Sequence, residues 1–217
     1  MLRTTLLRTR RGLRAGFTLI ELLAVILIIG ILTTFLLPRI PEAIDAAEVT
    51  ACKRNMSEIH AAILRYKTTH SRLPNKSGAR FLAELISSGA LENSKGAVTK
   101  LTCPGVDIGA LPGISAKEPV EWFAHPEEVD GNYTAYAGRN CKDFPLRKLA
   151  GDEILVADDN DPAMNHRHTT VALYGDGSTQ TFELDQLHEK GLLDKDLKYL
   201  EVGPGSPVED LTKMSLD

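Results

Sequence analysis

Two groups of residues carry side chains that could bind a metal ion or form an ion pair. The first is the run Asp158-Asp159-Asn160-Asp161, which is followed closely by His166 and His168. Carboxylate and amide oxygens are the ligands that Ca²⁺ prefers, so this run could hold a calcium ion. An acidic turn ahead of Pro162 is the simpler interpretation, because the run lacks the glycine that an EF-hand loop places at its sixth position.

A zinc site made of His166, His168 and Asp159 is a third interpretation of the same residues. An open zinc site activates water, and it would be the only route to an enzyme that this sequence offers. No helical segment carries the paired histidines and glutamate of zinc hydrolases, and no glycine-rich phosphate loop follows a strand. The residues therefore favour a protein that is not an enzyme and predict no cofactor other than, at most, a calcium ion.

The second group centres on Glu21, the one charged residue in the apolar run from Phe17 to Leu37. Such a run can cross a bilayer, because a membrane helix needs roughly 20 apolar residues. A carboxylate within it costs on the order of 2.5–3.5 kcal/mol at the bilayer centre and less near the interface. Because the run contains no basic residue, we expect Glu21 to find its partner outside this helix. The α-amino group that cleavage between Gly16 and Phe17 would create on a neighbouring copy is one such partner; protonation or snorkelling is the alternative.

The residues Gly16-Phe17-Thr18-Leu19-Ile20-Glu21, after a short arginine-rich leader, resemble the N-terminal signal of type IV pilins and type II secretion pseudopilins. The resemblance implies that a prepilin peptidase cleaves after Gly16 and N-methylates Phe17. It implies that Glu21 registers subunits in a filament, and that Gly30 and Pro38 bound a helix stretch that loosens there. The implied partners are the peptidase, other pilin or pseudopilin subunits, and an inner-membrane assembly platform.

A second resemblance lies near the C-terminus, where His166 is followed after nine residues by Asp176-Gly177. This spacing is similar to a signature of prepilin-type proteins, although Thr169-Thr170 stands where that family often has glycines. The signature implies no catalytic role. From the residues alone, we expect Gly175-Asp176-Gly177 to turn a hairpin and His166 to hydrogen-bond into that turn.

The distribution of charge predicts the topology. The leader, residues 1–16, holds five arginines and no acidic residue. Without it, 20 basic residues (25 less five) face 29 acidic ones, a net charge of −9. We therefore expect no nucleic acid to bind, because phosphate binding relies on clustered Lys and Arg. Arginines stay cytoplasmic, which predicts a single-pass protein whose residues beyond Leu37 face the outside of the membrane. The resemblance to pilins implies that this membrane is the bacterial inner membrane and that the head is periplasmic. A conventional secretory signal is a weaker alternative, because its apolar region would be shorter.

Three cysteines allow one disulfide bond in an oxidising compartment. Cys103 and Cys141 both lie in turn-like sequence, and we expect them to pair. Cys52 shares an apolar helical stripe with Met56, Ile59, Ile63 and Tyr66, which predicts a buried thiol.

The element pattern predicts an α+β fold of the type IV pilin kind, with a long N-terminal helix packed on an antiparallel sheet. The expected divisions are a cleaved leader (1–16), a membrane helix (17–37), an amphipathic continuation (38–70), a globular head (71–202) and a flexible tail (203–217). A short helix is expected over 79–90 and a closing helix over 186–198. Strands are expected at 120–124, 133–137, 154–157, 170–174 and 178–184.

Two functional hypotheses follow. The favoured one is a structural subunit that polymerises from the membrane into a type II secretion pseudopilus or a type IV pilus-like filament. The alternative is a membrane-anchored extracytoplasmic metal-binding protein or metalloenzyme, supported by the acidic run and the two histidines. The sequence does not separate a secretion pseudopilus from a pilus or a DNA-uptake fibre.

Overall fold

The computed structural model describes residues 16–159 and 165–217, which divide into two units at Ala43 and Ile44. The first unit contains helix α1 (Leu19–Leu36) and the 3-10 turn η1 (Leu37–Arg39), which starts next to Pro38. Helix α2 (Ile40–His70) begins there, and its residues from Ile44 onward belong to the second unit. Proline lacks an N–H donor, which explains why the α-helical pattern changes at this point.

The second unit is built on a five-stranded antiparallel sheet with strand order β4-β3-β2-β1-β5. Its strands are β1 (Tyr136–Arg139), β2 (Ile154–Asp158), β3 (Thr169–Tyr174), β4 (Thr179–Glu183) and β5 (Met214–Ser215). The helices α3 (Ala79–Ser87), α4 (Lys95–Val98) and α5 (Leu184–Glu189) complete it, together with the 3-10 turns η2 (Thr99–Leu101), η3 (Ile108–Ala110), η4 (Pro119–Glu121), η5 (Gly131–Tyr133) and η6 (Glu209–Lys213). The predicted α+β class with an antiparallel sheet is confirmed.

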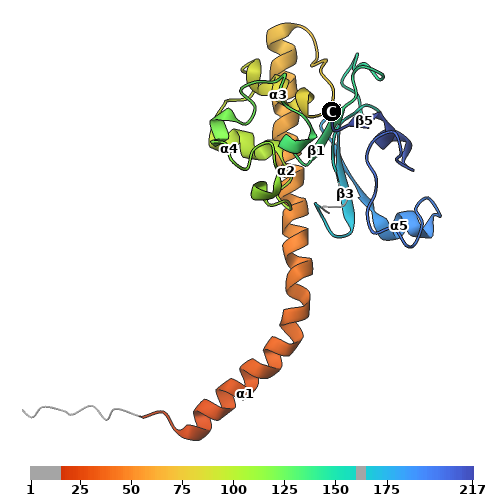
Figure 1. The fold of residues 1–217 in the computed structure, drawn as a ribbon. Helices are drawn as coiled ribbons and strands as arrows, with labels where there is room; N and C mark the ends of the chain where they lie inside the picture. Colours follow the sequence, from red (N-terminus) through yellow and green to blue (C-terminus); the bar gives the residue numbers. More distant parts are fainter. Residues whose placement is uncertain (1–15, 160–164) are drawn as a thin grey trace, which may run out of the picture. The chain divides into compact units, whose positions relative to one another are not determined.

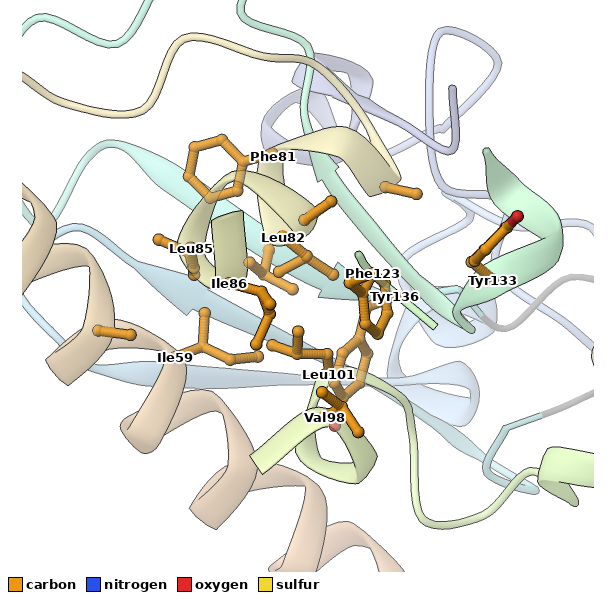
Figure 2. Close-up of a cluster of buried hydrophobic side chains, with 14 of the residues drawn as sticks. Ile59, Phe81, Leu82, Leu85, Ile86, Val98, Leu101, Phe123, Tyr133 and Tyr136 are labelled. Atoms are coloured by element: carbon orange, nitrogen blue, oxygen red, sulfur yellow. The ribbon is translucent and has the colours of Figure 1, made fainter. Parts of the chain in front are cut away.

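Both faces of the sheet are covered, because side chains along a strand point alternately to opposite faces. In β3, Val171 and Leu173 pack into a cluster with residues of α2 and α3, whereas Ala172 and Tyr174 pack into a second cluster with α5 and the C-terminal segment. Figure 1 shows the sheet lying between α2 and α5. Figure 2 shows the larger cluster, in which side chains from α2, α3 and the η2 region meet Tyr136 of the sheet.

The stripe predicted for α2 is confirmed, since each of its members is at most 1% exposed: Cys52, Met56, Ile59, Ile63 and Tyr66. The predicted short helix also forms, as α3, and Gly89 lies just beyond it with a φ of +72°. The hairpin at Gly175-Asp176-Gly177 joins β3 to β4 as predicted. The closing helix differs from the prediction, because it begins earlier, at Leu184, and ends at Glu189.

Two predicted elements are wrong. The strand expected at 120–124 is instead the turn η4 and the residues after it, because Pro119 starts a helical turn and the Trp122 Nε1 atom donates to the Lys117 carbonyl over 2.9 Å. In place of a flexible tail, the last residues form η6 and β5, which pairs with β1. Leu211 and Met214 are fully buried there, so apolar burial outweighs the preceding Pro-Gly-rich sequence.

Candidate functional site

The start of α1 places the residues of the predicted cleavage and assembly site. Gly16 and Phe17 precede the helix, and Thr18 is its N-cap residue. The Glu21 carboxylate accepts hydrogen bonds from the Thr18 backbone N–H over 2.8 Å and from the Thr18 hydroxyl over 2.7 Å. The Glu21 N–H donates in return to the Thr18 hydroxyl oxygen over 3.3 Å. These reciprocal bonds form a capping box, which satisfies N–H groups that the first helical turn leaves without acceptors.

The capping box corrects the expectation that Glu21 depends wholly on a group outside its helix. Thr18 supplies two donors from within the same segment, although neither carries a charge. A carboxylate has about four lone-pair positions, so two bonds from Thr18 leave capacity for a cation as well. The cap and a charge pair are therefore compatible roles for Glu21, and experiments must separate them.

Helix α1 presents apolar side chains on every side. Leu23, Leu27 and Ile31 are 52–65% exposed within this chain, and no residue of α1 is buried. The continuous helical stretch Leu19–His70 contains an 18-residue window with a mean hydropathy of 2.7. By length and composition, this stretch could cross a membrane. Gly30 lies within regular α-helix and Pro38 within η1, so the predicted loosening between them in a filament stays a prediction.

The C-terminal signature does not bring His166 to the hairpin turn. The six residues of β3 separate His166 from Asp176-Gly177, and a strand of that length spans about 20 Å. His60 of α2 makes the predicted contact instead, because its Nε2 atom lies 3.0 Å from the Gly175 carbonyl oxygen. Asp176 closes the turn by accepting from the Ser178 N–H over 2.9 Å, and the bonds from Ser178 lower the pKa of this carboxyl. The turn is structural.

The three residues of the predicted zinc site, His166, His168 and Asp159, do not converge in the structure. Asn160 and Asp161 lie outside the described residues, so the calcium site stays a prediction. Asp158 is fully buried and faces the interior, and the Asp159 N–H donates to the Ala135 carbonyl over 3.0 Å. His166 is 1% exposed whereas His168 is exposed at the surface. Among the described residues, no group of converging metal-ligand side chains contains His168 or Asp159.

Four buried side chains come together that the sequence did not connect. Cys52 of α2, Cys103 after η2, Asp158 at the end of β2 and His166 before β3 are each at most 1% exposed, and their potential ligand atoms all lie within 4.8 Å of one another. His166 Nε2 is 3.0 Å from Asp158 Oδ2 and 3.4 Å from Cys103 Sγ. The signal that could have identified them is Cys103-Pro104-Gly105, a tight turn that offers a thiol with a backbone N–H behind it.

This cluster corrects the predicted disulfide bond. All three cysteines are free and buried. Cys103 lies with Cys52 and His166, whereas the Cys141 thiol faces the Pro74 carbonyl oxygen at 3.9 Å. The turn-like sequence around Cys103 and Cys141 was a poor guide to pairing, because the fold carries the two turns to different neighbours.

The geometry does not support a nucleophilic cysteine. In a Cys–His–Asp triad one imidazole nitrogen faces the thiol and the other faces the carboxylate. Here the same atom, His166 Nε2, faces both groups. As long as no cation is bound beside it, burial raises the pKa of the Cys103 thiol, which keeps it protonated and weakly nucleophilic. Burial opposes a charge on His166, yet the hydrogen bond with Asp158 raises the pKa of the imidazole to about 10.

Comparison with known proteins identified a sequence motif and a relative. Residues 11–37 match the prokaryotic N-terminal methylation motif. The chain is 36% identical over 66 residues to type II secretion system core protein G of Pseudomonas aeruginosa. The alignment covers 30% of this chain and 46% of that protein, so the chain spans about half the length of the curated relative it matches. No solved structure matches the chain significantly. The motif, the aligned relative and the long-helix α+β fold together support a pilin- or pseudopilin-like protein.

Proposed function

We propose that this chain is a pilin-like structural subunit of a type II secretion pseudopilus or a type IV pilus-like filament. A prepilin peptidase removes the leader after Gly16 and N-methylates Phe17. The α1 helices then line the filament core, and the second units form its surface. The observation that carries the proposal is the match of residues 11–37 to the methylation motif.

The exposed surface of α1 supports this assignment. A helix that is apolar all round is stable only in a lipid or protein environment, and residues 16–43, the described part of the first unit, supply no cover for it. A membrane before assembly and neighbouring copies after assembly both provide such cover. A membrane-anchored single-pass protein fits these features, and we further propose a cytoplasmic leader, a periplasmic second unit and docking of the chain on an inner-membrane assembly platform.

Processing is tested by intact-mass analysis of the full-length chain, produced with and without an active prepilin peptidase. We expect the mass of residues 17–217 plus one methyl group in the first case and the unprocessed mass in the second. Replacing Gly16 with a bulky residue, as in Gly16→Phe, should prevent cleavage, whereas Gly30→Ala should be processed normally. An intact leader on the wild-type chain in the presence of active peptidase rules the proposal out.

Assembly is tested by three variants that separate the two roles of Glu21. Glu21→Gln keeps an oxygen acceptor for Thr18 and removes the charge, Thr18→Ala removes the cap and keeps the charge, and Glu21→Ala removes both. If the carboxylate pairs with the α-amino group of a neighbouring subunit, Glu21→Gln and Glu21→Ala abolish filaments and Thr18→Ala still assembles. If helix capping is what matters, Thr18→Ala fails together with Glu21→Ala. Filament yield is counted by electron microscopy and normalised to processed subunit.

A further inference from the structure

The buried cluster of Cys52, Cys103, Asp158 and His166 has the donor set of a zinc site. It offers two sulfur atoms, one imidazole nitrogen and one carboxylate oxygen. Zinc binds sulfur, nitrogen and oxygen ligands and favours a total of four, whereas Ca²⁺ and Mg²⁺ take oxygen ligands. A tetrahedral site with sulfur and nitrogen donors is diagnostic of zinc or of an iron–sulfur centre, and the single carboxylate and imidazole here favour zinc.

The distances within the cluster are close to those of a tetrahedron around one ion. With zinc–sulfur bonds of about 2.3 Å and zinc–nitrogen or zinc–oxygen bonds of about 2.0–2.2 Å, the edges of such a tetrahedron measure roughly 3.3–3.8 Å. The edge from His166 Nε2 to Cys103 Sγ, 3.4 Å, lies within this range, and the edge to Asp158 Oδ2, 3.0 Å, is slightly shorter. The other ligand atoms lie within 4.8 Å of one another, so small side-chain shifts would complete the tetrahedron. One nitrogen placed close to both groups is what a shared ion requires, since a single N–H can point well at only one acceptor.

Both cysteines have a hydrogen-bond donor behind the sulfur. The Gly105 N–H donates to Cys103 Sγ over 3.4 Å, and the Tyr136 hydroxyl donates to Cys52 Sγ over 3.4 Å. Donors in these positions stabilise thiolates, which are the form in which cysteine binds a metal. Gly105 also needs to be glycine, because a Cβ atom there would lie 1.8 Å from the Asn165 carbonyl oxygen. The turn that carries Cys103 is thus fitted closely against the residue before His166.

Neighbouring polar groups also orient the other two ligands, Asp158 and His166. The Asn165 side-chain amide donates to Asp158 Oδ1 and also, over 2.8 Å, to the Ala135 carbonyl, which leaves Oδ2 directed at His166. On the far side of the imidazole, Nδ1 faces Asp45 Oδ1 at 3.9 Å, and that carboxylate is fixed by the Arg167 N–H over 2.9 Å. A carboxylate behind a histidine and a hydrogen bond on a ligating carboxylate are the usual outer partners of metal ligands.

We propose that Cys52, Cys103, Asp158 and His166 bind one Zn²⁺ ion in a closed tetrahedral site. All four positions are filled by the protein and every ligand is buried, so no position stays open for water or substrate. The role is therefore structural and not catalytic. The ion joins residues that lie 51, 55 and 8 positions apart in the chain, namely in α2, after η2, at the end of β2 and before β3. This site is independent of the proposed filament function, because none of its ligands belongs to the N-terminal motif.

The first test measures metal on the full-length chain purified in detergent with its thiols reduced. We expect one zinc per chain by mass spectrometry of the metals, retained after dialysis against metal-free buffer. Replacement by Co²⁺ should give the intense visible absorption of a tetrahedral site with thiolate ligands. A chain that takes up no zinc overturns the proposal. A weak octahedral cobalt spectrum, or a Cys52–Cys103 disulfide found by peptide mapping of the untreated protein, overturns it equally.

Matched variants locate the ion. Cys103→Ser removes a ligand, Tyr136→Phe removes only the hydroxyl behind Cys52, and Cys141→Ser changes the third buried cysteine outside the cluster. In a competition with a chromophoric chelator, we expect Cys103→Ser to weaken zinc binding by at least about 100-fold and Tyr136→Phe by about tenfold. Cys141→Ser should bind as the wild type does. Affinities that are equal in all four proteins place the metal elsewhere and overturn the proposal.

Thermal unfolding provides a measurement that does not depend on the ligand variant folding well. Zinc binds the folded chain and not the unfolded one, so its removal lowers the unfolding temperature. We expect a strong chelator to lower the Tm of the wild type and of Cys141→Ser, and re-addition of zinc to restore it. A wild-type Tm that does not change when the zinc is removed contradicts the structural role.

Discussion

Helices α1 and α2 follow one another in the chain, yet their apolar side chains differ in exposure. Every large apolar side chain of α1 is more than 40% exposed, whereas six residues of α2 from Cys52 to Tyr66 are at most 1% exposed. An all-round apolar helix needs a surrounding apolar medium, while a helix with one apolar stripe needs one packed face. The first unit therefore needs an apolar environment that its described residues do not provide, whereas the second unit covers the stripe of α2 with its own residues.

The polar contacts of the two units differ in the same way. Glu21 is bonded by Thr18, three residues away, whereas His166 meets Cys52, Cys103 and Asp158, which come from three other segments. A contact within one helical turn follows from local sequence. A contact between distant segments exists only when the whole unit is folded. Changes in the second unit should therefore alter global stability, and comparable changes in α1 should not.

The largest effect is expected from the buried charge of the second unit. Arg139 is 4% exposed, pairs with Glu153 over 2.7 Å and donates to the Ile154 carbonyl over 2.9 Å. Arg139→Met leaves these acceptors unpaired and should destabilise the fold by about 3–5 kcal/mol. Thr18→Ala, which removes the partner of the α1 charge, should leave unfolding of the second unit unchanged. Denaturant unfolding of the full chain, followed by fluorescence of the single tryptophan, Trp122, measures both.

Lys148 provides the matched control for that experiment. It pairs with Asp152 over 3.4 Å, but both side chains are more than 60% exposed. Because water screens such a pair, Lys148→Met should change the free energy of unfolding by no more than about 1 kcal/mol. If Arg139→Met and Lys148→Met lower the free energy of unfolding equally, burial does not determine how much these ion pairs contribute to stability.

A pair of identical substitutions tests the contrast between the helices directly. Ile59 of α2 is fully buried, and Ile26 of α1 is 55% exposed. Ile59→Ala leaves a cavity and should cost about 2–5 kcal/mol in the same unfolding measurement. Ile26→Ala should have no effect on it. The contrast fails if Ile26→Ala lowers the stability that Trp122 reports.

Alanine substitutions at two glycines should give a smaller difference in stability. Gly177 has a φ of +86° and a Cβ there would lie 2.9 Å from the His60 ring, whereas a Cβ at Gly30 meets nothing within 4 Å. Gly177→Ala should therefore cost about 1–2 kcal/mol of stability from backbone conformation alone. Gly30→Ala should leave the unfolding curve of the second unit in place. If Gly177→Ala unfolds at the wild-type denaturant concentration, the turn relaxes freely and the contact with His60 is unimportant.

The last effect is expected only at alkaline pH and belongs to the second unit alone, since all five tyrosines lie in it. Burial, together with the hydrogen bond that Tyr66 donates to Glu84 over 2.6 Å, raises the pKa of Tyr66 to about 12. An unfolded tyrosine has a pKa of about 10. As pH rises from about 10 to 12, the unfolded chain loses this proton first, so the free energy of unfolding falls. Its decline should be shallower in Tyr66→Phe; parallel declines would contradict the assignment.

The features that arise from interactions between residues close together in the chain could be predicted from the sequence. The apolar run and its glutamate identified α1 and the resemblance to pilins, the stripe from Cys52 to Tyr66 identified the buried face of α2, and Gly175-Asp176-Gly177 identified the β3–β4 hairpin. Each rests on periodicity or turn chemistry within a few residues. The same local reasoning failed at 120–124 and at the C-terminus, where a proline-initiated turn and burial of Leu211 and Met214 decided the outcome.

Which polar residues from distant segments meet depends on the complete fold. Local sequence suggested a disulfide between Cys103 and Cys141 and a contact between His166 and the hairpin turn. The fold instead placed His60 at the turn and assembled Cys52, Cys103, Asp158 and His166 in the interior. The reason is that strand pairing and the packing of α2 fix these positions over separations of tens of residues, which no local pattern encodes.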